Sequence, residues 1–283
     1  MPLKRKRKKS KKKKHHIILI LLLIAAGIFL FMEEFGKEDS PKSFFDIPEP
    51  AKKAEIKWPE THPPTTLPMV AIVMDDLGPN RKFAEIVLSI RSPLTLSILP
   101  QQRYSKWIAE EGKRLGRDII VHLPMEAARP LKLGEGGLYT WMADDEIKHI
   151  VEEDIRSVPY IMGASNHMGS AFTKDSRTMQ VLMSVLKKHR LFFLDSRTTP
   201  ESVGFRLAKE GGLKTLRRDI FLDDTDNLRE IEIQWNKLIE VAQKKGRAIA
   251  LAHPKKNTLE FLQKVLKNNK DIIVVPISDL IVK

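Results

Sequence analysis

The chain of 283 residues contains no cysteine, so no disulfide bond stabilises it. Small exported domains often depend on disulfides, whereas a domain of about 200 residues buries enough apolar surface to fold without them. Once the N-terminal segments described below are set aside, residues 69–283 remain. An α/β barrel commonly has this length as a single unit, so we expect one domain stabilised by its core alone.

Outside its first 14 residues the chain has almost no excess of positive charge. The formal net charge is +13, but residues 1–14 hold ten Lys and Arg and no acid, which leaves 39 basic against 36 acidic residues. A nucleic-acid-binding domain carries a basic surface, and no such surface is available here. We therefore expect no nucleic-acid partner, and we interpret residues 1–16 as a basic tail.

Residues 17–32 have no charged side chain. A membrane-spanning helix needs about 17 to 25 apolar residues, and a secretory signal has an apolar core of about 7 to 15, so the run lies between the two. Its cluster of small residues at 25–27 is followed by further apolar residues. This favours an uncleaved transmembrane anchor over a cleaved signal peptide. The ten preceding charges predict a single-pass protein with a cytoplasmic N-terminus and an extracytoplasmic domain, and they attract the tail to anionic lipid.

Residues 33–68 contain seven prolines, several charges and little hydrophobic periodicity. This composition is typical of an extended, solvated linker. We expect it to let the domain stand off the membrane.

From residue 69 onward, strand-like and helix-like patterns alternate. The expected strands are 69–74, 94–99, 118–123, 160–165, 191–195, 213–222, 247–252 and 271–275. The expected helices are 79–91, 104–116, 143–157, 174–189, 201–210, 227–245 and 257–269. Strands that alternate with helices of this length indicate βαβ units, and hence a parallel α/β barrel or open sheet.

Six of these strands end on residues that can bind a metal or move a proton. They are Asp75 and Asp76, His122, Asn166 and His167, Asp195, Asp223 and Asp224, and His253. Each residue alone is common at a strand end, because Asp, Asn and His form turns. The carboxyl ends of parallel strands converge on one face, however, and that face carries the active site. The pattern therefore predicts an enzyme with a pocket of carboxylates and histidines.

Asp75 and Asp76 form the most informative motif, because adjacent carboxylates repel each other unless a cation or a shared proton offsets the repulsion. Neutral imidazole is the commonest zinc ligand, and a catalytic zinc site typically has three protein ligands. Asp76, His122 and His167 would supply them. We expect a divalent metal here, with zinc favoured.

The long stretch 124–142 beside this face contains Tyr139 and Trp141. Long loops are often functional, and these aromatic rings could stack on a sugar or could simply pin the loop to the domain. Glu126 and Asn166 lie near the expected site and could support it.

Two further charged segments follow later strands. Asp195 is expected to orient His253 or another imidazole, and Arg197 to bind substrate or pair with an acid, unless the two form a salt bridge at the mouth of the barrel. Residues 223–226 are expected to form a solvated turn before the helix 227–245.

The motifs MDDLG, LSILP, HLPME, NHMGS, LDSRT and AHP, in this order, resemble the divergent polysaccharide deacetylases, distant relatives of the NodB-homology deacetylases. The resemblance covers residues 69–283. It implies a distorted (β/α) barrel of about seven to eight parallel strands and a metal-dependent hydrolase that removes acetyl groups from a polysaccharide such as peptidoglycan. In the relatives an Asp-Asp pair supplies a base and then a metal ligand, which correspond to Asp75 and Asp76. A late Leu-x-His supplies the general acid, which corresponds to His253.

The chain departs from that pattern in its metal motif. The relatives use His-x-x-x-His, but here Ala171 and Gly163 stand four residues after and before His167. Either His122 supplies the second imidazole from another strand, or the metal site is degraded. Two alternatives therefore stay open: a glycan- or partner-binding module without turnover, and a metal-independent glycoside hydrolase that uses Asp76 and Glu126.

Overall fold

The computed structural model describes residues 67–281. The expected basic tail, transmembrane anchor and linker at 1–66 lie outside the described residues. Within 67–281, no helix combines the length and the apolar character needed to cross a membrane.

The expected alternation of strands and helices is confirmed. The strands are β1 (Met69–Leu77), β2 (Thr95–Ile98), β3 (Ile119–Met125), β4 (Gly163–Met168), β5 (Phe192–Asp195), β6 (Thr215–Arg217), β7 (Ile220–Phe221), β8 (Arg247–Ala252) and β9 (Ile273–Val274). The helices are α2 (Arg81–Ser89), α3 (Ser105–Arg114), α4 (Asp144–Ser157), α5 (Ser176–Lys188), α6 (Gly204–Glu210), α7 (Leu228–Lys245) and α8 (Lys256–Lys267), with 3-10 turns η1 (Phe172–Lys174) and η2 (Ile277–Leu280).

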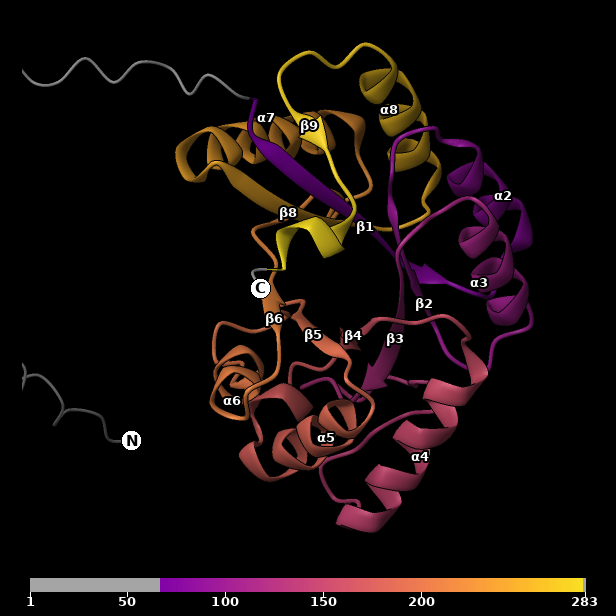
Figure 1. Ribbon diagram of the computed structural model, residues 1–283, viewed down its shortest axis with the longest axis vertical. Helices are drawn as coiled ribbons and strands as arrows, with labels where there is room; N and C mark the ends of the chain where they lie inside the picture. Colours follow the sequence, from indigo (N-terminus) through magenta and orange to yellow (C-terminus); the bar gives the residue numbers. More distant parts are fainter. Residues whose placement is uncertain (1–66, 282–283) are drawn as a thin grey trace, which may run out of the picture. The chain divides into compact units, whose positions relative to one another are not determined.

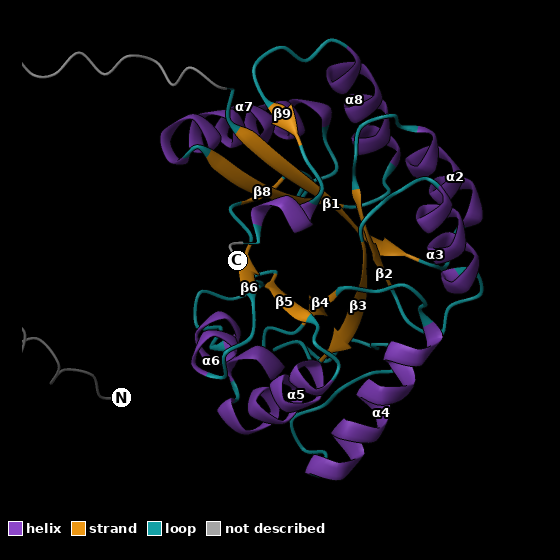
Figure 2. Cartoon of the chain, in the orientation of Figure 1, coloured by secondary structure: helices purple, strands orange, loops and turns teal. Residues whose placement is uncertain are grey.

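The strands form one parallel sheet in the order β6-β5-β4-β3-β2-β1-β8-β7, with β9 beside β1. The sheet curls around a central axis, as Figure 1 shows. The helices lie outside the strands (Figure 2). The expected α/β architecture is therefore confirmed as a curled, barrel-like sheet.

The curl stays open between β6 and β7, which are its two edges. A single strand was expected at 213–222, but β6 pairs with β5 and β7 pairs with β8. Between them, the Arg218 N–H donates to Asp195 O and the Asp219 N–H donates to Ile249 O. The chain thus passes from one edge of the sheet to the other here, because these two residues bond to opposite neighbours.

Inward-facing residues change from apolar to polar toward the carboxyl ends of the strands. One buried cluster packs inside the curl and includes Val73, Ile120 and Leu251. Because strand side chains alternate between faces, the next inward positions are two residues further on. In β1 and β3 these are Asp75 and His122, and beyond β8 the next such position is His253. The same alternation that builds the core therefore places the proposed site above it.

Candidate metal centre and active site

A β-bulge in β1 turns both carboxylates of the Asp pair toward the same imidazole. Regular alternation would place Asp75 and Asp76 on opposite faces of the sheet. Instead the register between β1 and β2 shifts between Met74 and Leu77, and Asp76 has a φ of 58°. This left-handed conformation costs about 1–2 kcal/mol for an ordinary residue, although Asp tolerates it better than most. Bulges of this kind re-aim side chains near active sites.

The structure brings Asp76, His122 and His167 together at the ends of β1, β3 and β4. One potential ligand atom from each lies within 4.8 Å of the other two. Asp76 Oδ1 is 3.2 Å from His122 Nε2 and 2.7 Å from His167 Nδ1. Burial opposes the charge of Asp76, but the two imidazoles hold its pKa below the ordinary range.

The donor geometry around Asp76 Oδ1 fits a cation better than a hydrogen bond. This oxygen is buried and has no hydrogen-bond partner, although two imidazole nitrogens lie close to it. One carboxylate and two imidazoles are a ligand set that suits zinc and similar divalent ions. The three side chains can therefore hold a metal ion, as expected from the strand ends.

His253 lies on the other side of Asp76, with His253 Nε2 3.9 Å from Asp76 Oδ2. The Asp223 carboxylate binds the opposite edge of the ring, with 2.8 Å from His253 Nδ1 to Asp223 Oδ1. Asp223 also accepts hydrogen bonds from His253 N and Thr258 Oγ1. Burial alone would lower the pKa of His253, but the hydrogen bond and the charge of Asp223 raise it to about 9.

The interpretation of residues 223–226 as a solvated turn is therefore wrong for Asp223, which is fully buried. The role expected for Asp195, to orient His253, belongs to Asp223. The phase of the strand explains this: Phe221 packs on the inner cluster, so position 223 faces the same way. Asp224 and Asp226 are exposed, as expected of a turn.

Asp75 is the second buried carboxylate of the site, and its side chain is 2% exposed. Burial raises the pKa of Asp75, while the charges of His122 and His253 and a hydrogen bond from Ser97 act in the opposite direction. Its Oδ1 atom is buried without a hydrogen-bond partner. Burial thus favours the protonated form of the Asp75 carboxyl group.

Asp195 and Asn166 support the loops behind the site. Asp195 faces outward from β5, because Phe192 and Leu194 occupy the inward positions. Its carboxylate accepts hydrogen bonds from Ser202 Oγ, Phe205 N and Arg197 N. It therefore orders the segment that leads into α6. Asp195 and Arg197 are joined through this main-chain contact rather than by the expected salt bridge.

Asn166 ties the ends of β4 and β5 together. Its Oδ1 accepts from Ser196 N at 2.9 Å and its Nδ2 donates to Met168 O at 2.8 Å. Both polar ends of the side chain are therefore engaged by the main chain, and Asn166 shapes the loops around His167.

Sequence reasoning missed Phe221, which packs on His253, and Arg218, which packs on Phe221. The ring of Phe221 stacks on the imidazole with centroids 5.9 Å apart and planes inclined by 17°. The guanidinium of Arg218 lies 3.9 Å above the Phe221 ring and donates to Ser196 O and Arg197 O. Both lie at the break between β6 and β7, which the expectation of a single strand at 213–222 did not include.

Glu126 anchors the long loop through Thr140. Its Oε2 atom accepts from Thr140 N at 2.7 Å and from Thr140 Oγ1 at 2.6 Å. On the other side of that residue, Arg177 donates to Thr140 O. The structure thus gives Glu126 a supporting partner in the long loop.

The loop carries an aromatic pair near its end, shortly before α4. The Tyr139 and Trp141 rings are stacked with centroids 5.5 Å apart, and Trp141 is 70% exposed. Tyr139 packs on the core while Trp141 faces solvent. The pair therefore combines the two expectations. Tyr139 pins the loop to the domain, and the exposed Trp141 ring is available to stack on a sugar.

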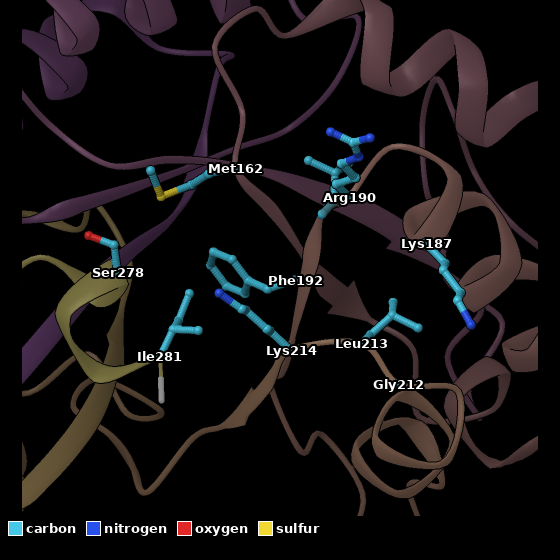
Figure 3. A pocket seen from close by; sticks show the side chains of 10 residues that line it. Met162, Lys187, Arg190, Phe192, Gly212, Leu213, Lys214, Ser278 and Ile281 are labelled. Atoms are coloured by element: carbon cyan, nitrogen blue, oxygen red, sulfur yellow. The ribbon is translucent and has the colours of Figure 1, made fainter. Parts of the chain in front are cut away.

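A hollow of about 500 Å³ lies at the opposite end of the curl. Figure 3 shows Phe192 and Lys214 within it, with Met162 and Ile281 on either side. Met162 precedes β4 and Lys214 precedes β6, so this hollow is at the amino ends of the strands. Asp76, His122 and His167 do not line it, so it is separate from the candidate metal centre.

Comparisons with known proteins agree with this fold. Residues 72–281 match the model of the divergent polysaccharide deacetylase family, so the chain belongs to that family. It is 38% identical over 212 residues to an uncharacterised protein of Haemophilus influenzae, covering 75% of this chain and 76% of that protein. It is 34% identical over 213 residues to the uncharacterised protein YibQ of Escherichia coli, covering 75% and 67%.

Among solved structures, the chain resembles protein ATU2773 of Agrobacterium tumefaciens. The TM-score is 0.72 at 20% sequence identity, and the match covers 77% of this chain and 90% of that protein. This similarity supports the fold.

Proposed function

We propose that this protein is a metal-dependent hydrolase that removes acetyl groups from an N-acetylated polysaccharide, such as one of the cell wall. One observation carries the proposal: Asp76, His122 and His167 converge at a buried oxygen that lacks a hydrogen bond, between a buried carboxylate and a paired histidine. Membership of the divergent polysaccharide deacetylase family supports the substrate class. The exposed Trp141 ring, which could stack on a sugar, is consistent with it.

Asp76, His122 and His167 would hold the ion, and the imidazole donors favour zinc. A divalent metal at this position supplies Lewis acidity for attack on an acetyl carbonyl. The chain itself supplies the proton transfers. Asp75 is the base that takes a proton from the attacking water. Burial raises the pKa of Asp75, so its ionised form binds a proton more strongly than an exposed carboxylate does.

His253 is the proposed acid that protonates the departing amine. With a pKa raised to about 9, the imidazole carries a proton at neutral pH, and Asp223 stabilises that charged form. The hydrogen bond from His253 Nδ1 to Asp223 leaves Nε2 facing the site, where a leaving group can accept its proton. Asp223 thus orients His253, as a carboxylate orients the catalytic histidine in other enzymes.

Metal binding is the most direct test of the site. The protein is expected to bind one equivalent of zinc, and Asp76→Ala, His122→Ala and His167→Ala should each weaken this binding strongly, because each removes one of three ligands. Elemental analysis of the purified protein and calorimetric zinc titration measure the effect. His149→Ala, which changes a histidine on the exposed face of α4, is the matched control and should bind as the unaltered chain does.

Failure of the unaltered protein to bind zinc, cobalt or manganese would contradict the metal centre. If the protein binds metal but releases no acetate from N-acetylated glycans or peptidoglycan over a broad pH range, deacetylation is wrong. Retained binding of glycan fragments would then favour a binding module.

We also propose that residues 17–32 anchor the protein in a membrane with the domain outside the cytoplasm, on the basis of the ten basic residues before this uncharged run. A phosphatase reporter that is active only outside the cytoplasm, fused after residue 60, is expected to be active. A reporter active only in the cytoplasm should be silent at the same position. The reverse pattern would contradict the topology, and a mature N-terminus near residue 28 would contradict the retained anchor alone.

A further inference from the structure

The amino-end face of the curled sheet, where the chain enters each strand, is strongly basic. It consists of the segments that lead from the last turn of a helix to the first residue of the next strand, which are 86–95, 111–119, 158–163, 185–192, 207–215, 242–247 and 264–273. After α4 the face begins only at residue 158, because Asp154 and Ser157 contact Gln101 beyond the carboxyl end of β2.

The charge of this face differs from that of the opposite end. Its segments hold 15 Lys and Arg and four acids. The segments that lead from each strand end to the first turn of the next helix hold 13 basic and 12 acidic residues. The fold therefore gathers the excess of basic residues at one end, and the expectation that no basic surface is available is wrong for this face.

The helix dipole does not account for the asymmetry. It favours cations in the last turn of a helix and acids in the first turn to a similar degree. The last turns of α3, α5, α6, α7 and α8 carry Lys or Arg, but the first turns of α2, α3, α5, α6 and α8 have no acid. The basic charge is thus a property of this face rather than of each helix.

The same face exposes large apolar and aromatic side chains at or just before the start of a strand. They are Met69, Leu115, Tyr160, Met162 and Ile273, and they are between 37% and 56% exposed. Cations beside exposed apolar and aromatic side chains are typical of a surface that lies in a membrane interface. A nucleic-acid interface is more polar, so this combination favours lipid.

The hollow of about 500 Å³ joins the basic and the apolar features of this face. Lys187, Arg190 and Lys214 line it, and none of its lining residues is acidic. Met162 and Phe192 contribute apolar surface to the same hollow (Figure 3). A phospholipid has the matching chemistry, because it carries a phosphate next to an apolar chain.

We propose that the amino-end face docks on a membrane surface that contains anionic phospholipid, with a headgroup phosphate held by Lys187, Arg190 and Lys214. β1 begins at Met69 on this face, so the chain joins the domain on the side that faces the lipid. The candidate metal centre lies at the carboxyl ends of the strands, so docking turns Asp76 away from the lipid and toward a polymer beyond it.

The test uses the full chain in lipid nanodiscs, whose two faces are both accessible whichever way the protein inserts. Because the chain has no cysteine, Leu115→Cys places a single fluorescent dye on the amino-end face, and Leu228→Cys places it at the start of α7, at the opposite end. In discs with equal parts of phosphatidylcholine and phosphatidylglycerol, spin labels on the headgroups should quench the dye at residue 115 but not the dye at residue 228. Phosphatidylcholine alone should leave both dyes unquenched, as should salt of about 1 M, which screens charges beyond about 3 Å.

A triple variant tests the role of the hollow. Lys187→Gln, Arg190→Gln and Lys214→Gln together should weaken docking by about 100-fold and so abolish the quenching, because each cation near an anionic lipid surface contributes several-fold to binding. All three side chains are exposed, so the variant should keep its fold, which circular dichroism checks.

The matched control combines Arg129→Gln, Lys132→Gln and Lys256→Gln, which remove the same charge from exposed positions after strand ends. Its dye at residue 115 should be quenched as in the unaltered chain. A chain that does not stay with the discs contradicts the anchor alone, and the two dyes are then measured with added vesicles of the same two compositions.

Equal quenching of the two dyes, or no response to phosphatidylglycerol, would overturn the proposal. Quenching that survives in the folded triple variant would overturn it as well. A dye at residue 115 that responds to duplex DNA but not to phosphatidylglycerol would replace it with a nucleic-acid surface. None of these outcomes depends on zinc binding or acetate release, so the proposed function is tested separately.

Discussion

Asp75→Asn is expected to lower the rate of acetate release by about 10²–10⁴-fold, the usual contribution of a positioned general base. Asparagine has nearly the same shape but cannot accept the proton of the attacking water. Asp75 is not one of the three side chains that converge on the metal position, so zinc should still bind. Initial rates of acetate release from N-acetylated chitooligosaccharides, measured beside zinc content, check both expectations.

The outcome is informative only if the variant remains folded. The amide of the variant can leave an N–H unpaired at the position of the buried Oδ1, which costs about 1–3 kcal/mol, so the thermal midpoint is measured to check that the variant is folded. Asp226→Asn, in the exposed turn before α7, is the control and should keep full activity. A zinc-loaded Asp75→Asn protein that retains more than about a tenth of the rate would exclude Asp75 as the base, since a general base contributes far more.

The ends of strands β1, β3 and β4 could be predicted because the sequence pattern and the topology act together. Apolar runs of strand length locate Asp76, His122 and His167 at carboxyl ends, and parallel strands bring those ends to one face. The partners of these residues could not be predicted in the same way. The bulge that turns Asp76 inward depends on pairing with β2, which no local pattern of β1 reveals.

The misassignment of Asp195 and Asp223 has a different cause. Both residues lie at strand ends. Side chains of a strand point alternately into the curl and outward, and only this alternation decides whether such a carboxylate faces the site or the start of the next helix. For β5 the phase of the alternation could not be read from the sequence, because residues 191–194 are all apolar. For Asp223 it was hidden, since the strand breaks after Arg217 and restarts at Ile220 with a different partner.

Another buried carboxylate lies away from the site and has no proposed part in catalysis. Asp154 of α4 is fully buried beneath the long loop. Its Oδ1 accepts from Gln101 Nε2 at 2.8 Å, while Oδ2 has no partner. Gly136, with a φ of 73°, lets the loop pass directly over this carboxylate, where any side chain would collide with it. Burial raises the pKa of Asp154 to about 7, in spite of the hydrogen bond from Gln101.

Asp154→Asn is therefore expected to change how stability depends on pH. The folded pKa of about 7 lies above the ordinary value of 3.8, so between these values the folded protein keeps a proton that the unfolded chain releases. The contribution of Asp154 to the free energy of unfolding is thus highest below pH 3.8 and falls as pH rises toward 7, by about 4 kcal/mol in total. Asparagine does not titrate, so this fall should disappear.

Urea unfolding at intervals from pH 4 to pH 8 measures the effect as the difference between variant and unaltered protein. The buried amide of the variant has an unpaired N–H, which costs about 1–3 kcal/mol at every pH, so the variant should be the less stable protein near pH 4. Toward pH 8 the order should reverse, because the unaltered protein then holds a buried charge. Glu146→Gln, an exposed change on the same helix, should give a nearly constant difference. Parallel stability curves for Asp154→Asn and the unaltered protein would show that Asp154 is already ionised at low pH, and that the loop does not exclude water from it.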